Sequence, residues 1–117
     1  MPKSRRCLDL GRALARAIKS FSGYQRVALM ASGGLTHFVI DEEFDRRIMD
    51  AMRAGDEDAL ANLPESYFKV GTAETKNWFP VIAAMNSAGL TYHQVDYVPC
   101  YRSEAGTGCA MCFAYWE

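Results

Sequence analysis

Histidine is the side chain that titrates near neutral pH, and one of the two in this chain follows a glycine-rich turn. The stretch 31–45 reads ASGGLTHFVIDEEFD and presents His37 just after Gly33 and Gly34. The apolar run Arg26–Ser32 before it predicts a strand buried on both faces, and ligands bind beyond the carboxyl ends of such strands in open α/β sheets. His37 is therefore a candidate acid/base residue. The alternative is a histidine fixed by local hydrogen bonds in a structural turn.

Glu74 is a second candidate, because it falls in the first turn after Thr72, the expected N-cap of a helix. Backbone N–H groups and the helix dipole favour an ionised carboxylate there, which is what a divalent metal needs. An ordinary helix-start glutamate is the alternative. His93 lies in an alternating segment between Tyr92 and Gln94, so we expect a surface or half-buried strand histidine rather than a ligand.

Four cysteines complete the reactive side chains. Cys109 and Cys112 have CxxC spacing, but their flanks alternate like a strand, no second CxxC is present and neither histidine is near in sequence. We expect two half-buried strand thiols. A thiol or metal module built on these two residues with Cys100 and Cys7 is the alternative.

The elements that must position these residues follow from apolar periodicity and turn signals. The first half of the chain predicts a helix around Leu8–Ile18, the strand Arg26–Ser32, and a helix that is capped by Asp41 and ends near Ala54. The second half predicts a short helix capped by Asp56, a helical region over Gly71–Leu90, and the strands Tyr92–Arg102 and Gly108–Trp116. Pro80 predicts a kink, or two helical pieces meeting near Trp78. Pro99 predicts an edge strand or a bulge. This order indicates an α/β fold, with a small mixed sheet flanked by helices in a single domain over 1–117.

Composition excludes several classes of protein. Half of the 117 residues are hydrophobic, with six Phe, six Tyr and two Trp, so a packed core is expected. The formal net charge of −1, with acidic and basic residues mixed along the chain, argues against a basic surface that binds nucleic acid. No apolar run is long enough to span a bilayer, and charges over residues 12–19 interrupt any signal-peptide core, so we expect a cytoplasmic protein.

Three stretches carry a resemblance to a known family: ASGGLTHFVIDEEFDRRIMDAM, LPESYFKVGTAETKNW and VDYVPCYRSEAGTG. They resemble the class III extradiol ring-cleavage dioxygenases. More narrowly, the chain looks like the C-terminal portion of the catalytic β chain of protocatechuate 4,5-dioxygenase and its gallate relatives. The resemblance runs from about Arg5 to Trp116, and its most specific pieces are Ser32–His37 and Gly71–Trp78.

The resemblance implies extradiol cleavage of a catecholic aromatic acid, such as protocatechuate or gallate, with Fe(II) and O2. It implies that His37 is the acid/base histidine beside the iron and Glu74 the carboxylate of a 2-His-1-carboxylate triad. It also implies substrate contacts from the turn before and around His37, namely Ser32, Gly33, Gly34 and Thr36.

The family's two iron-ligating histidines belong to its N-terminal half, and His93 matches no ligand position. The resemblance therefore implies that activity needs an N-terminal half, or a homo-oligomer partner, that supplies those histidines. A non-catalytic truncated remnant that folds or oligomerises without metal is the alternative.

Overall fold

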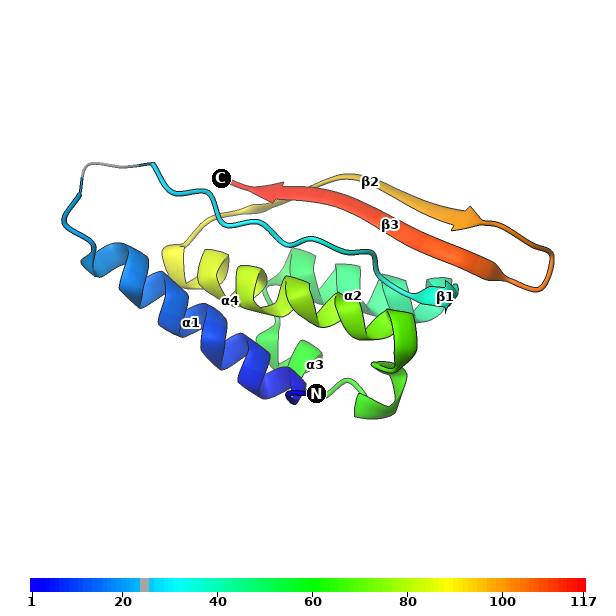
Figure 1. Ribbon diagram of the computed structural model, residues 1–117. Coiled ribbons are helices and arrows are strands. Elements are labelled where there is room, and N and C mark those ends of the chain that lie inside the picture. The colour runs from blue at the N-terminus through cyan, green and yellow to red at the C-terminus, as the bar shows by residue number, and fades with distance from the viewer. Residues whose placement is uncertain (24–25) are drawn as a thin grey trace.

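Figure 1 shows the computed structural model, in which the helices lie on one side of a small sheet; the structure describes residues 1–23 and 26–117. The elements are α1 (Ser4–Ser20), β1 (His37–Val39), α2 (Glu42–Ala54), α3 (Glu57–Ala61), the 3₁₀ helices η1 (Glu65–Tyr67) and η2 (Val70–Asn77), α4 (Trp78–Ala88), β2 (Tyr92–Tyr101) and β3 (Thr107–Trp116).

The sheet has the strand order β1-β3-β2, and both strand pairs are antiparallel. The predicted α/β class with a small sheet is confirmed, although the expected mixed pairing is replaced by antiparallel pairing. β2 is an edge strand, which accommodates Pro99 because one side of an edge strand makes no ladder bonds. The register across β1 and β3 places His37 opposite Cys109.

Helix α2 begins and ends where the sequence predicts. The Asp41 side chain accepts from the Phe44 N–H at 2.9 Å, and Gly55 closes the helix in the left-handed region at φ 64°. Phe44, Ile48 and Met52, spaced four residues apart, form its buried stripe and are at most 2% exposed.

The predicted interruption in the next helical region is confirmed as two pieces, with η2 ending at Asn77 and α4 beginning at Trp78. Pro80 falls in the first turn of α4, where a missing N–H breaks no helical bond. Gly89 caps α4 at φ 72°. Thr72 as a helix N-cap is wrong: it lies inside η2, and its hydroxyl bonds to the His37 backbone instead.

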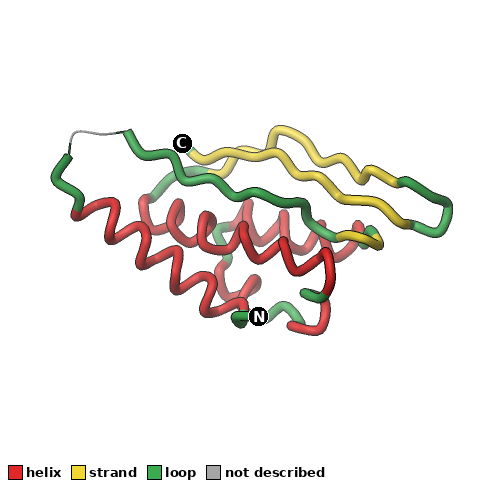
Figure 2. The backbone as a smooth tube through the Cα atoms, viewed as in Figure 1, coloured by secondary structure: helices red, strands yellow, loops and turns green. Residues whose placement is uncertain are grey.

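The buried strand predicted over Arg26–Ser32 is also wrong. Most of its side chains are exposed, with Met30 at 85%, and none of residues 26–31 makes a backbone hydrogen bond in the described part of the chain. Figure 2 shows this segment as a loop running along β3. The apolar sequence is typical of a central strand, but no strand within the described residues pairs with this segment.

The core lies between the helices and the inner face of the hairpin. Leu8, Phe44, Phe79 and Ile82 are almost fully buried, and the core also includes Ala110 and Cys112 on β3. No helix in the described residues is long and apolar enough to cross a membrane.

Candidate functional site

His37 begins β1 and is held in one orientation by its neighbours. The ring Nδ1 lies 2.9 Å from the Leu35 carbonyl oxygen. A carbonyl only accepts, so Nδ1 carries the hydrogen and Nε2 keeps its lone pair in the neutral ring. Nε2 lies 3.4 Å from Oε2 of Glu74. The side chain is 9% exposed, whereas that of Glu74 is 58% exposed, so this pair joins a buried base to a solvent-facing carboxylate.

Two threonines of η2 fix the backbone around this histidine. The Thr72 hydroxyl accepts from the His37 N–H at 3.1 Å and donates to the His37 carbonyl at 2.9 Å. The Thr75 hydroxyl donates to the Leu35 carbonyl at 3.0 Å. Gly71 allows η2 to approach β1 this closely, because a Cβ at this position would lie 2.5 Å from the His37 carbonyl oxygen. The packing of η2 against β1 therefore sets the position of the ring.

The turn at Gly33 and Gly34 passes between the Glu74 side chain and strand β3. A Cβ at Gly33 would lie 3.2 Å from Oε2 of Glu74, and the residue has φ 127°, which favours glycine. A Cβ at Gly34 would lie 2.6 Å from Sγ of Cys109. The Gly33 carbonyl accepts from the Trp78 indole N–H at 3.1 Å. Both glycines are needed for a close backbone approach to the candidate site.

Ser32 and Thr36, which flank this turn, have different surroundings. Ser32 is exposed, and its carbonyl accepts from the Asn77 side-chain amide at 3.1 Å. Thr36 is 2% exposed, and its hydroxyl donates to Asp45 at 2.9 Å and accepts from the Asp41 N–H at 2.8 Å. The Thr36 hydroxyl is therefore engaged inside the protein, next to the histidine.

The sequence analysis did not single out Asp45, whose charge suggests an exposed position on its helix. It is fully buried and accepts from the Thr36 N–H and hydroxyl, both at 2.9 Å, and from the Tyr97 hydroxyl at 2.7 Å. Burial raises the pKa of Asp45, and the bonds from Tyr97 and Thr36 oppose that rise. Its place next to Phe44 and three residues before Ile48, within the apolar stripe, was the available signal.

A pocket of about 490 Å³ opens beside the histidine, lined by His37, Phe38, Cys100, Tyr101, Arg102, Gly108 and Cys109. Arg102 brings a positive charge to this pocket, and the aromatic rings of Phe38 and Tyr101 give it apolar walls. Such a combination suits a small aromatic molecule that carries an acidic group.

The other histidine lies far from this group. His93 pairs with Tyr115 in the ladder, while His37 pairs with Cys109, six residues away along β3. At about 3.3 Å per residue the two positions are about 20 Å apart. His93 stacks on the Tyr115 ring with centroids 4.9 Å apart, as expected for a half-buried strand histidine.

The metal that the resemblance implies does not fit the donors present in this chain. Within the described residues, no group of three or more His, Cys, Asp or Glu lies where it could hold a metal ion. Glu74 offers one carboxylate, and a facial triad needs two further ligands. Cys112 is buried in the core while Cys109 borders the pocket, so the CxxC pair does not converge on one ion.

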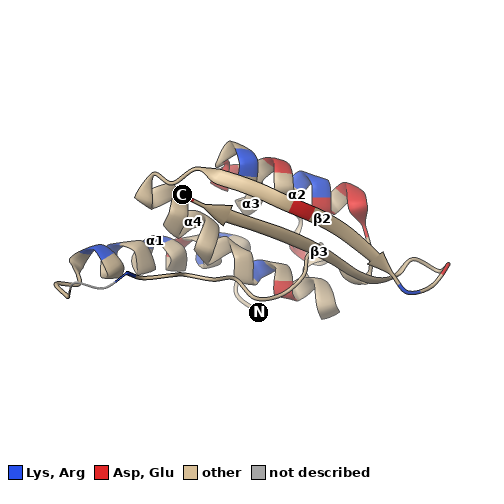
Figure 3. Ribbon diagram, turned by 90° about the horizontal axis from the view of Figure 1, so that it is seen from above, with Lys and Arg blue, Asp and Glu red and all other residues tan. Residues whose placement is uncertain are grey.

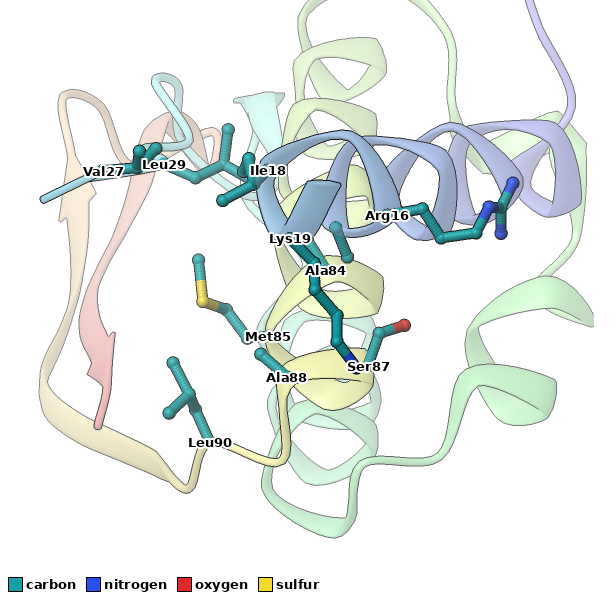
Figure 4. Close-up of a pocket in the computed structure, with 11 residues that line it drawn as sticks. Arg16, Ile18, Lys19, Val27, Leu29, Ala84, Met85, Ser87, Ala88 and Leu90 are labelled. Carbon is teal, nitrogen blue, oxygen red and sulfur yellow. The ribbon is translucent and has the colours of Figure 1, made fainter. Parts of the chain in front are cut away.

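A second pocket, of about 540 Å³, lies between the C-terminal ends of α1 and α4 and the segment that begins at residue 26. Figure 4 shows Ile18, Met85 and Leu90 directed toward the space below Val27 and Leu29. Its lining contains no His, Cys, Asp or Glu, so it offers apolar contact rather than catalytic chemistry.

Comparison with known proteins gives one family and one curated relative. Residues 1–108 match the family described as the catalytic LigB subunit of aromatic ring-opening dioxygenase. Gallate dioxygenase of Pseudomonas putida is 31% identical over 110 residues, covering 85% of this chain and 32% of the relative. The chain thus spans about a third of that relative's length. No solved structure matches. The chain belongs to the LigB family of catalytic subunits of aromatic ring-opening dioxygenases.

Proposed function

We propose that this chain supplies the acid/base histidine and one metal-binding carboxylate of an extradiol ring-cleavage site. The observation that carries this proposal is the pairing of His37 Nε2 with Glu74 Oε2 at 3.4 Å, with Nδ1 fixed on the Leu35 carbonyl. The reaction is cleavage of a catecholic aromatic acid by O2 with Fe(II). The two histidines that complete the iron site come from polypeptide outside these 117 residues.

His37 takes a proton from a catechol hydroxyl at Nε2, because that nitrogen holds the free lone pair. The Nδ1 hydrogen stays on the Leu35 carbonyl, so the ring keeps its orientation while it gains charge. The imidazolium then faces the Glu74 carboxylate, which stabilises it. A carboxylate has two oxygens, so this contact leaves one for a metal. Ring opening needs the completed metal site, and this chain's own share is the proton transfer.

Arg102 supports an acidic substrate. Its guanidinium can pair with the carboxylate of a ring bound in the pocket beside His37. Gallate and protocatechuate both carry a carboxylate opposite the hydroxyls that meet a base. Ser32, Gly33 and Gly34 are proposed as further substrate contacts, although the two glycines border a neighbouring pocket with Trp78. Thr36 positions the histidine from inside the protein.

The outer face of the sheet supports a polypeptide partner. Val95, Phe113 and Tyr115 on this face are 47–67% exposed, and Met30 on the neighbouring segment is 85% exposed. Figure 3, which looks down on the sheet, shows its strands almost free of charged residues, whereas the helices carry many. Residues 26–31 also leave their backbone groups without a hydrogen bond among the described residues. A strand from the polypeptide that is proposed to supply the two histidines would satisfy those groups and cover the apolar face.

The whole arrangement is proposed to be one cytoplasmic domain that is completed by its partner. The second candidate is a remnant without catalysis, in which a second copy of the chain covers the same face. The exposed apolar face and the incomplete ligand set favour it, because both are present in the isolated chain.

A chimera separates these two functions. This chain replaces the matching segment of Pseudomonas putida gallate dioxygenase, and gallate-dependent O2 uptake is measured with added Fe(II). The proposal predicts uptake that His37→Ala and Glu74→Ala abolish and that His93→Ala, a histidine about 20 Å away along the sheet, leaves intact. A chimera that folds by circular dichroism and takes up no O2 favours the remnant.

A further inference from the structure

Two thiols lie next to the candidate site on the outer face of the sheet. Cys100 on β2 is the direct ladder partner of Cys109 on β3, and Cys109 is also the partner of His37 on β1. The three residues therefore form one row across the three strands. All three also line the same pocket.

The register puts the two thiols within bonding reach. Directly opposed residues of an antiparallel pair have Cα atoms about 4.5–5.5 Å apart and side chains on the same face. Disulfides span Cα separations of about 4.4–6.8 Å. The loop of the hairpin, at 102–106, begins only two residues after Cys100, where the strands can adjust to bring the sulfurs together.

The other two cysteines have different surroundings. Cys112 is three residues after Cys109 and is buried in the core, and Cys7 is buried on α1. All four cysteines are free thiols in the structure. Cys112 thus provides a natural internal control, because it lies on the same strand but not in the row.

We propose that Cys100 and Cys109 are a peroxide-sensitive dithiol that closes to a disulfide beside His37. The thiolate of Cys100 attacks one peroxide oxygen, the O–O bond breaks, and a sulfenic acid and water result. The sulfur of Cys109 then attacks the sulfenic sulfur, the S–S bond forms, and a second water leaves with the Cys109 proton. The two thiols lose two electrons, and hydrogen peroxide is reduced to water.

The surroundings assign the order of the two steps. Cys100 is exposed, so peroxide reaches it first. Burial raises the pKa of Cys109, and the neighbouring Cys100 and Glu74 raise it further, so its thiol stays protonated until the sulfenic acid forms. Disulfide formation draws Sγ of Cys109 toward Cys100 and away from the Gly34 backbone that borders the candidate site. Any effect of this movement on ring cleavage rests on the proposed function, whereas the disulfide itself does not.

The test uses the complete purified chain and hydrogen peroxide at stoichiometric concentration, followed by alkylation of the remaining thiols. Trypsin cleaves after Lys76 and Arg102, so the peptides 77–102 and 103–117 separate unless a disulfide joins them. The proposal predicts a joined pair in wild type that a thiol reductant separates, with iodoacetamide still labelling Cys112.

Three variants decide which sulfurs react. Cys112→Ser should keep the joined peptides, whereas Cys100→Ser and Cys109→Ser should lose them, each with a wild-type circular dichroism spectrum. Joined peptides that persist in Cys109→Ser, or a wild type that passes to sulfinic acid without joining, would overturn the proposal. Neither readout depends on ring cleavage, so the failure of the proposed function leaves this result intact.

Discussion

Replacing Asp45 with alanine should remove a large part of the chain's stability. The buried carboxylate accepts from the Thr36 N–H and hydroxyl, both at 2.9 Å, and from the Tyr97 hydroxyl at 2.7 Å. Each buried donor left without an acceptor costs about 1–3 kcal/mol, so the two donors of Thr36 alone cost about 2–6 kcal/mol. A domain is stable by only about 5–15 kcal/mol, so Asp45→Ala approaches unfolding at room temperature.

Asp45→Asn should lose less than Asp45→Ala, because its side-chain carbonyl oxygen still accepts from Thr36, whereas its amide nitrogen only donates and cannot replace the second carboxylate oxygen as an acceptor. The raised pKa also means that stability held by the neutral carboxyl is lost as pH rises through that pKa, and Asp45→Asn should lack this loss.

Urea denaturation of both variants measures these differences, with Asp50→Ala as the matched control. Asp50 lies on the same helix but is exposed, and its pair with Arg53 three residues on is worth only about 0.2–0.5 kcal/mol. Asp45→Ala within about 0.5 kcal/mol of Asp50→Ala would refute the reasoning, since surface substitutions fall in that range.

Three further predictions follow from single contacts. Despite burial, which raises it, the pKa of Glu65 is lowered to about 2 from 4.5 by bonds from Lys76 and the Ser4 N–H. Its stabilisation is present above pH 4.5 and lost as pH falls toward 2, so Glu65→Gln should flatten the acid limb of a thermal-melt series. Gly34→Ala places a Cβ 2.6 Å from Sγ of Cys109 and 2.8 Å from a backbone oxygen, so it should lower the melting temperature by several degrees. Arg102→Met in the chimera should raise KM for gallate about tenfold or more and change KM for uncharged catechol little, as measured by O2 uptake; equal changes for both substrates would contradict the assigned pairing.

Local sequence signals predicted the helices and the hairpin well. Asp41 caps the helix that ends at Ala54, as predicted, and Gly55 and Gly89 close the two helices in conformations that depend on a few neighbours. The interruption near Trp78 follows from proline chemistry alone. The alternation over Tyr92–Arg102 and Gly108–Trp116 likewise predicts two strands and a hairpin, which the structure has at Tyr92–Tyr101 and Thr107–Trp116.

Features that depend on contacts distant in sequence were missed. The segment Arg26–Ser32 has the composition of a central strand, but a strand exists only where another strand pairs with it, and among the described residues none pairs with this segment. Thr72 reads as a helix cap, yet its hydroxyl bonds to a residue 35 positions earlier. Asp45 reads as a surface charge until the Tyr97 hydroxyl, 52 positions later, reaches it. Residue type and spacing therefore identified His37 and Glu74 as candidates, while the residues that hold them required the structure.

Anaerobic Fe(II) titration tests most directly the central claim that this chain carries one carboxylate ligand of a site completed from outside. The isolated chain and the chimera with gallate dioxygenase are titrated side by side, each with its Glu74→Ala variant. The account predicts stoichiometric Fe(II) binding by the chimera that Glu74→Ala abolishes, and no binding by the isolated chain above its Glu74→Ala background. Stoichiometric, Glu74-dependent binding by the isolated chain, or iron retained by the Glu74→Ala chimera, would contradict it.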